Sequence, residues 1–253
     1  MCKKAATTPL KSDPAAYTVA ALSIAVGAGS LVVFTFFLYV GPFNITDFRL
    51  GVFQMLLLDA CLCIVFFLQH SGMVRKTLRY RASKYISERF ISAVFSVTSG
   101  VMLLILVILW QESTLTLASA EGLSRWSMRT LFFLAGAGQV WGIWSLKSAD
   151  LFGTDALLRH QGTMLKTTCL VIRGPYRWVR HPLYFTTLLM IWSYPDLTAD
   201  RLLFNVLFTL WIIAGTVLEE RDLVEDYGDD YRGYQRAVPM LIPYRKPTTQ
   251  QTA

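Results

Sequence analysis

The chain has 253 residues, of which 54% are hydrophobic and 16% charged, and its formal net charge at pH 7 is +7. A soluble domain carries nearer a quarter of charged residues, so this composition excludes an ordinary soluble fold and indicates a membrane protein. The basic excess does not indicate nucleic-acid binding, because anionic lipid headgroups explain it more simply.

Six apolar runs follow one another along the chain and predict an all-α integral membrane protein with about five to six transmembrane helices. The first run is too long for a cleavable signal peptide, and we expect it to be retained as a helix. The first four runs predict spans, and the last two predict a C-terminal helical hairpin whose short first arm is either a half-span or one arm of the hairpin. The runs are 15–40, 51–68, 90–110, 131–146, 183–194 and 202–218.

Lysine and arginine residues alternate in density between the two sides of these runs. They are concentrated before the first run, in the connections 70–89 and 147–182, and after Leu218. Under the positive-inside rule, the N-terminus, these two loops and the tail face the cytoplasm. We expect a single domain over residues 1–253, with four spans in 14–146 and the loop, hairpin and cytoplasmic tail in 147–253.

Two features inside the runs concern helix packing. Gly138 and Gly142 form a small-xxx-small pair within "GAGQVWG", which favours close helix packing over nucleotide binding because no strand precedes it. Asp59 is a carboxylate in an apolar run, so it is either an inward-facing functional group or a neutral or paired residue that holds helices together. The four cysteines indicate neither a disulfide framework nor a metal site.

A polar group closes the second run in "QHSGMVRK". Gln69, His70 and Ser71 come together where the basic loops converge. His70 is either an interfacial polar residue or part of a functional site, whereas His160 has no such neighbours and is expected at the surface.

The C-terminal third holds the densest constellation. "RGPYRWVRHPLY" precedes the first arm of the hairpin, and "LEERDL" ends the second. Read separately, Arg180 is a topological anchor and Glu219 and Glu220 are a solvated helix end. A hairpin instead brings Arg180 and His181 beside both glutamates at the cytoplasmic face. That pocket suits a charged cofactor from the cytosol and an apolar substrate from the bilayer.

These residues carry a resemblance to a known family. "RHPLY", the glutamate pair and the tail "VPMLIP" resemble the membrane-embedded methyltransferases that include isoprenylcysteine carboxyl methyltransferase and phospholipid methyltransferases. "FFLQHSGMVR", "ADLFG" and "GDDYR" are similar to the bacterial methanethiol S-methyltransferase branch, which is related to NnrU-type proteins. The resemblance implies a bacterial inner-membrane enzyme that uses S-adenosyl-L-methionine, and methanethiol as acceptor to give dimethyl sulfide. A prenylcysteine carboxylate or lipid amine as acceptor, or a non-catalytic NnrU-like protein, is the alternative.

The resemblance also implies a set of cofactor-binding residues. One departure is Thr186, where many relatives have a glycine that lets the cofactor approach closely. The implied cofactor-binding residues are Gly174, Pro175, Tyr176, Arg180, His181, Pro182, Tyr184, Glu219 and Glu220.

The expected chemistry follows from the charges of the cofactor and the acceptor. A guanidinium binds a carboxylate bidentately, so Arg180 suits the cofactor carboxylate, and the glutamate pair suits its ammonium or ribose, or orients Arg180. A small thiol must lose a proton, which His181 or His70 accepts. We place His70 near the substrate and His181 near the cofactor, and we expect membrane lipid as a partner and no metal.

Overall fold

The computed structural model describes residues 14–146, 150, 152–154, 157, 170 and 172–248. The described residues are mainly α-helical, as predicted, with one small antiparallel sheet. In chain order the elements are α1 (Pro14–Val40), α2 (Val52–Val74), α3 (Lys76–Ala82), α4 (Glu88–Leu109), β1 (Thr116–Ser119), α5 (Gly122–Leu146), the 3₁₀ helix η1 (Gly174–Arg177), α7 (Pro182–Trp192), β2 (Asp196–Thr198), α8 (Ala199–Tyr227) and α9 (Asp229–Ala237).

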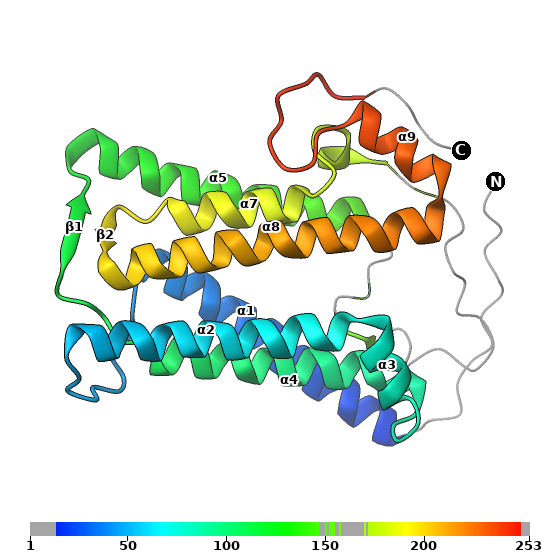
Figure 1. Cartoon of the computed structure of the whole chain (residues 1–253), viewed down its shortest axis with the longest axis horizontal. Coiled ribbons are helices and arrows are strands. Elements are labelled where there is room, and N and C mark those ends of the chain that lie inside the picture. The colour runs from blue at the N-terminus through cyan, green and yellow to red at the C-terminus, as the bar shows by residue number, and fades with distance from the viewer. Residues whose placement is uncertain are drawn as a thin grey trace.

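The long helices form two layers. Helices α1, α2 and α4 make one layer, and α5, α7 and α8 make the other (Figure 1). The two layers meet where α2 packs on α8. Strands β1 and β2 pair at one end of the molecule, and α3 and α9 lie at the opposite end (Figure 1). We call these the sheet end and the α9 end.

Helices α1, α2, α4 and α8 are long and apolar enough to cross a membrane, which confirms the predicted all-α membrane fold. Helix α7 has 11 residues and is about 16 Å long, so it reaches only halfway across about 30 Å of hydrocarbon. Helix α5 begins at Gly122, well before the predicted run, and is less apolar because it includes Arg125 and Arg129. It packs along α7 rather than with the N-terminal layer.

Aromatic side chains fill the space between the layers. The rings of Phe204 and Phe208 on α8 stack with centroids 4.1 Å apart. Phe34 and Phe37 of α1 contact the same pair. Such ring pairs add about 0.5–1.5 kcal/mol each beyond the burial of their area, so this aromatic core joins the two layers.

Buried polar contacts hold the sheet end together. Both oxygens of Asp200 on α8 are occupied, because Nε1 of Trp110 and the backbone N of Ser113 each donate to this carboxylate at 3.0 Å. Arg201 donates from Nη2 to the carbonyl oxygen of Leu38 on α1 at 2.6 Å. These contacts tie the start of α8 to the layer of α1 and α4.

Asp59 is a further link at the sheet end. Its carboxylate is fully buried, and Oδ1 accepts a hydrogen bond of 3.0 Å from the backbone N of Gln111, just after α4. Of the two interpretations offered by the sequence, this contact fits the one in which Asp59 holds helices together.

Two helices extend further than their apolar runs. Helix α2 continues to Val74 and α8 continues to Tyr227, whereas the runs end at Leu68 and Leu218. Polar residues end a membrane-compatible run but not a helix, because the backbone hydrogen bonds remain within the segment. His70 and both glutamates therefore stand on rigid helices.

Candidate functional site

The candidate site lies at the α9 end, where the start of the hairpin meets α8 and the segment after α9. Helix α7 begins with Pro182. Proline has no backbone N–H, and at the first helical position an N–H would have no helical partner. The N of Arg180 donates to the carbonyl oxygen of Pro239 at 2.9 Å, and the N of His181 donates to that of Met240 at 3.1 Å. This backbone pairing fixes the direction of both side chains.

Arg180 and Glu220 form a buried bidentate ion pair. Nε donates to Oε1 at 2.6 Å and Nη2 donates to Oε2 at 2.9 Å, and the two side chains are 9% and 11% exposed. Nη1 donates to the carbonyl oxygens of Gln235, at 3.0 Å, and of Val238. Every nitrogen of this guanidinium thus has a protein acceptor, so the pair is built into the framework of the site.

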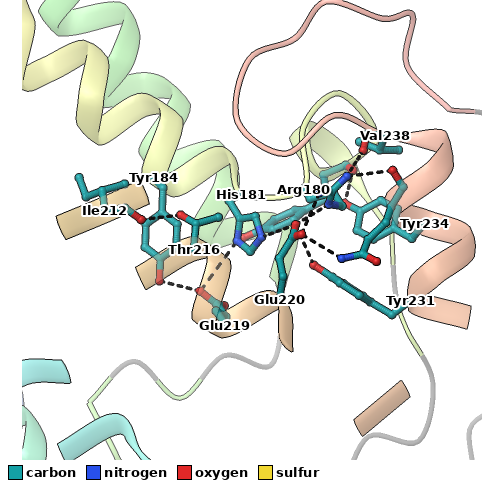
Figure 2. A network of polar contacts seen from close by, with 12 residues as sticks. Arg180, His181, Tyr184, Ile212, Thr216, Glu219, Glu220, Tyr231, Tyr234 and Val238 are labelled. Carbon is teal, nitrogen blue, oxygen red and sulfur yellow. Dashed lines mark hydrogen bonds and ion pairs between the residues drawn. The ribbon is translucent and has the colours of Figure 1, made fainter. Parts of the chain in front are cut away.

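Glu220 is the centre of a wider network (Figure 2). Nε2 of His181 lies 3.1 Å from Oε1, and Nε2 of Gln235 donates to Oε2 at 2.9 Å. Burial raises the pKa of Tyr231, and the Glu220 carboxylate raises it further, so the phenol stays protonated and donates to Oε1 at 3.4 Å. Glu220 therefore joins α8 to α9 and to the start of the hairpin.

Glu219 has a different environment from its neighbour, because successive residues of a helix point about 100° apart. The hydroxyl of Tyr184 donates to its Oε2 at 2.7 Å, and Nδ1 of His181 lies 3.8 Å away (Figure 2). The rings of His181 and Tyr184 stack with centroids 5.6 Å apart. The Glu219 side chain is 44% exposed, so it is oriented by the protein and still accessible to a ligand.

The turn before the motif bridges α5 and α9. Gly174 has φ +53°, and a Cβ there would lie 2.2 Å from Oγ of Ser145 on α5, so only glycine fits. Pro175 is buried, and the carbonyl oxygen of Tyr176 accepts a hydrogen bond of 2.5 Å from the hydroxyl of Tyr234. The predicted residues of this turn therefore pack against two helices.

Arg177 is the last residue of the turn. Nε of Arg177 is buried and has no hydrogen-bond partner among the described residues. Burial, together with the nearby Glu219 carboxylate, raises the pKa of the adjacent Tyr176 to about 12, so this phenol is neutral. A buried donor without a partner among these residues makes Arg177 a candidate for binding an anion.

The departure at Thr186 is explained by packing between α7 and α5. A Cβ at Gly138 would lie 2.7 Å from Cγ2 of Thr186, and one at Gly142 would lie 2.6 Å from Cδ2 of Leu183. The predicted packing role of the two glycines is confirmed. Thr186 therefore points toward α5, and its methyl group fills the space that Gly138 leaves.

His70 lies apart from this network. Its ring packs against Phe66, Phe95 and Trp211, with centroids 5.1–5.5 Å apart. Nδ1 is buried and has no hydrogen-bond partner within the described part of the chain. Trp211 is eight residues before Glu219 on α8, or about 12 Å along the helix axis.

The structure thus brings five of the predicted site residues into one polar network. It also adds two residues that the sequence analysis missed, both on one face of α9 at the i, i+4 spacing that places side chains together. The five are Arg180, His181, Tyr184, Glu219 and Glu220, and the two additions are Tyr231 and Gln235.

A pocket of about 370 Å³ lies beside the network, on the face of α8 that turns toward α9. It is a shallow, open hollow rather than an enclosed cavity. In the predicted loop 147–182, most residues up to 171, including His160, lie outside the described residues. Within the described ranges, no group of three or more His, Cys, Asp or Glu side chains is placed to hold a metal ion. The pocket is lined by Val217, Glu220, Arg221, Val224 and Gln235.

Comparisons with known proteins place this geometry in context. The sequence model of the family described as "Phospholipid methyltransferase" matches residues 124–230, from α5 to the start of α9. The chain is 35% identical to "Methanethiol S-methyltransferase" of Pseudomonas sp., over 76% of this chain and 75% of that protein.

Two further relatives have similar names. They are "Methanethiol S-methyltransferase" of Pseudomonas deceptionensis, 33% identical over 77% of this chain and 76% of its own length, and "Methanethiol S-methyltransferase 1" of Bradyrhizobium diazoefficiens, 30% identical over 76% and 68%. No solved structure matches the chain.

Proposed function

Because the chain belongs to the family of the methanethiol S-methyltransferases, we propose that it transfers a methyl group from S-adenosylmethionine to a small thiol, with methanethiol giving dimethyl sulfide. The chain is a membrane methyltransferase by this membership. The observation that carries the choice of acceptor is the similarity to the named enzymes, which extends over three quarters of both chains.

The residues at the α9 end fit the proposed methyl donor. S-adenosylmethionine, when bound, supplies a methyl group on a positively charged sulfur. Its amino-acid end carries an ammonium group, which suits the accessible Glu219 carboxylate that Tyr184 orients. The same end carries a carboxylate, which suits Nε of Arg177, a donor without a partner in the described part of the chain.

The expected role of Arg180 changes under this proposal. Its guanidinium is saturated by Glu220 and by two carbonyl oxygens, so we assign it to positioning rather than to the cofactor carboxylate. Glu220 takes the second role that the sequence left open, because it orients Arg180. His181 and Pro182 then set where α7 begins, and with it the position of Tyr184.

The acceptor must lose its thiol proton before it attacks. An ordinary thiol has a pKa of about 8.5, and Nδ1 of His70 has no other partner among the described residues, so we assign the proton to this atom. The thiolate sulfur then forms a bond to the methyl carbon. The bond between that carbon and the sulfonium sulfur breaks, and its electron pair stays on the donor. His181, held between two carboxylates, remains on the donor side.

We further propose that the α9 end faces the cytoplasm of a bacterium and that the whole chain is one domain of the inner membrane. Exposed cations gather at this end, on and after α3 and along α9. Membrane insertion with this end inside follows from the positive-inside rule. The cationic side chains are Arg79, Arg81, Lys84, Arg89, Arg232 and Arg236.

A second candidate is methyl transfer to a lipid amine. The observation that favours it is the match of residues 124–230 to the phospholipid methyltransferase family. One experiment separates the candidates: purified protein receives S-adenosylmethionine with a labelled methyl group, together with thiols, a phospholipid amine or a prenylcysteine.

We expect label in volatile methyl sulfides in the headspace. Label only in the lipid or prenylcysteine fraction refutes the thiol as acceptor. Transfer to no acceptor, with the donor still bound, favours a non-catalytic protein.

A further inference from the structure

Helix α8 meets the end of α2 at two places, one on each side of Glu219. At the first, Nε1 of Trp211 donates to Oγ of Ser71 at 2.9 Å. At the second, Nη1 of Arg75 lies 3.6 Å from Oδ2 of Asp222. Glu219 therefore lies between the levels of these two contacts along α8.

The two contacts are spaced unequally on the two helices. From Trp211 to Asp222, α8 advances 11 residues, or about 16 Å, whereas from Ser71 to Arg75, α2 advances 4 residues, or about 6 Å. The long Arg75 side chain makes up part of the difference. Glu219 is 44% exposed, as expected for a stretch of α8 that α2 does not cover.

Aromatic rings surround the indole of Trp211 at the first contact. The indole stacks on Phe67 with centroids 4.5 Å apart and an interplanar angle of 10°. Phe66 and Phe208 meet the indole edge to face, at 5.5 Å and 5.7 Å. His70 lies at the same level, with its ring 5.3 Å from that of Trp211, so the proposed proton acceptor lies directly beside this stack.

We propose that the stacked rings of Phe67 and Trp211 form the floor of the acceptor site and restrict the acceptor to thiols with short alkyl chains. This inference rests on the proposed methyl transfer to a thiol. The sulfur must lie near His70 to lose its proton and must point toward the donor at Glu219. The alkyl group then points toward the floor, where each additional methylene meets the fixed indole.

The aromatic floor would also limit the other candidate acceptors. A lipid or prenyl chain needs a long apolar channel. The space on the sheet-end side of Trp211 is instead filled by the aromatic core around Phe204 and Phe208. An apolar cavity of about 150 Å³ inside a protein accepts a benzene-sized molecule. Replacement of the indole by a methyl group opens a space of this order.

The test is the chain-length profile of the acceptor. Wild type, Trp211→Ala and Phe67→Leu are purified, and kcat/KM is measured for straight-chain thiols of one, two, four and eight carbons with labelled S-adenosylmethionine. One methylene in an apolar pocket changes kcat/KM about tenfold or more. We expect wild type to fall steeply between one and four carbons. In Trp211→Ala, the ratio of the four-carbon to the one-carbon thiol rises at least about tenfold.

The matched control is Trp126→Ala, because Trp126 on α5 is 72% exposed and should keep the wild-type profile. If Trp211→Ala does not fold, Phe67→Leu decides, since it shortens the same stack with a smaller loss. A folded variant of either kind with the wild-type profile overturns the proposal. Wild type that methylates no thiol of any length refutes the proposed function itself, and a flat wild-type profile refutes only the floor.

Discussion

Glu220 and Glu219 have different proposed roles, so substitution of Glu220 should lower stability and substitution of Glu219 should lower the affinity for the donor. Glu220→Gln leaves the Arg180 guanidinium, 9% exposed, without a counter-charge. Removal of one partner of a buried ion pair costs about 3–5 kcal/mol. For a chain of this size, each kcal/mol lowers the melting temperature by about 2–4 °C, so we expect a fall of about 6–20 °C.

Glu219→Gln is the matched control, with the same chemical change one residue earlier. Its carboxylate is 44% exposed, so we expect a loss of at most about 1 kcal/mol and a fall of less than about 4 °C. Its affinity for S-adenosylmethionine should fall about tenfold or more, because the carboxylate is the proposed partner of the ammonium. Thermal unfolding of the purified protein and equilibrium binding of labelled donor measure the two effects. If Glu220→Gln keeps the wild-type melting temperature and loses only donor affinity, then Glu220 binds the donor and does not stabilise the site through its ion pair with Arg180.

Three further predictions concern the turn, the proton and the sheet end. Gly174→Ala should lower the melting temperature, because φ +53° is strained for alanine and its Cβ would lie 2.2 Å from Oγ of Ser145; an unchanged melting curve contradicts this reason. His70→Gln should lower kcat at pH 7 by about 10²–10⁴-fold and make the rate rise with pH as the thiol itself ionises, which a pH–rate profile measures. A parallel drop at every pH would instead indicate loss of packing. Asp200→Asn should cost about 1–3 kcal/mol without altering KM for either substrate, because its carboxylate binds Trp110 and Ser113 far from the site; an altered KM would show that the two ends are coupled.

The sequence predicted the membrane fold and the meeting of Arg180 and His181 with the glutamates, because a hairpin of apolar arms admits few arrangements. It did not predict which glutamate pairs with Arg180. That choice depends on the rotation of α8 about its axis and on the pairing of Arg180 and His181 with Pro239 and Met240, and neither is encoded in the spacing of a motif.

The missed residues have a similar explanation. Tyr231 and Gln235 reach Glu220 because the chain turns at Gly228, whose φ is +57°, and α9 folds back against α8. The sequence "YGDDYRGYQ" indicates a polar helix, but it does not show which of its faces is buried. Local sequence patterns therefore predicted the individual elements, but they did not predict which faces of those elements pack together.

The bond from Arg180 to the carbonyl of Val238 has a consequence for how the protein is made. The two residues are separated by 58 positions, and synthesis at about 5–20 residues per second adds them about 3–12 s apart. During that interval Arg180 exists without Glu220 and without the carbonyl oxygens of Gln235 and Val238. The site is therefore the last part of the molecule to assemble, after the membrane-spanning helices have been synthesised.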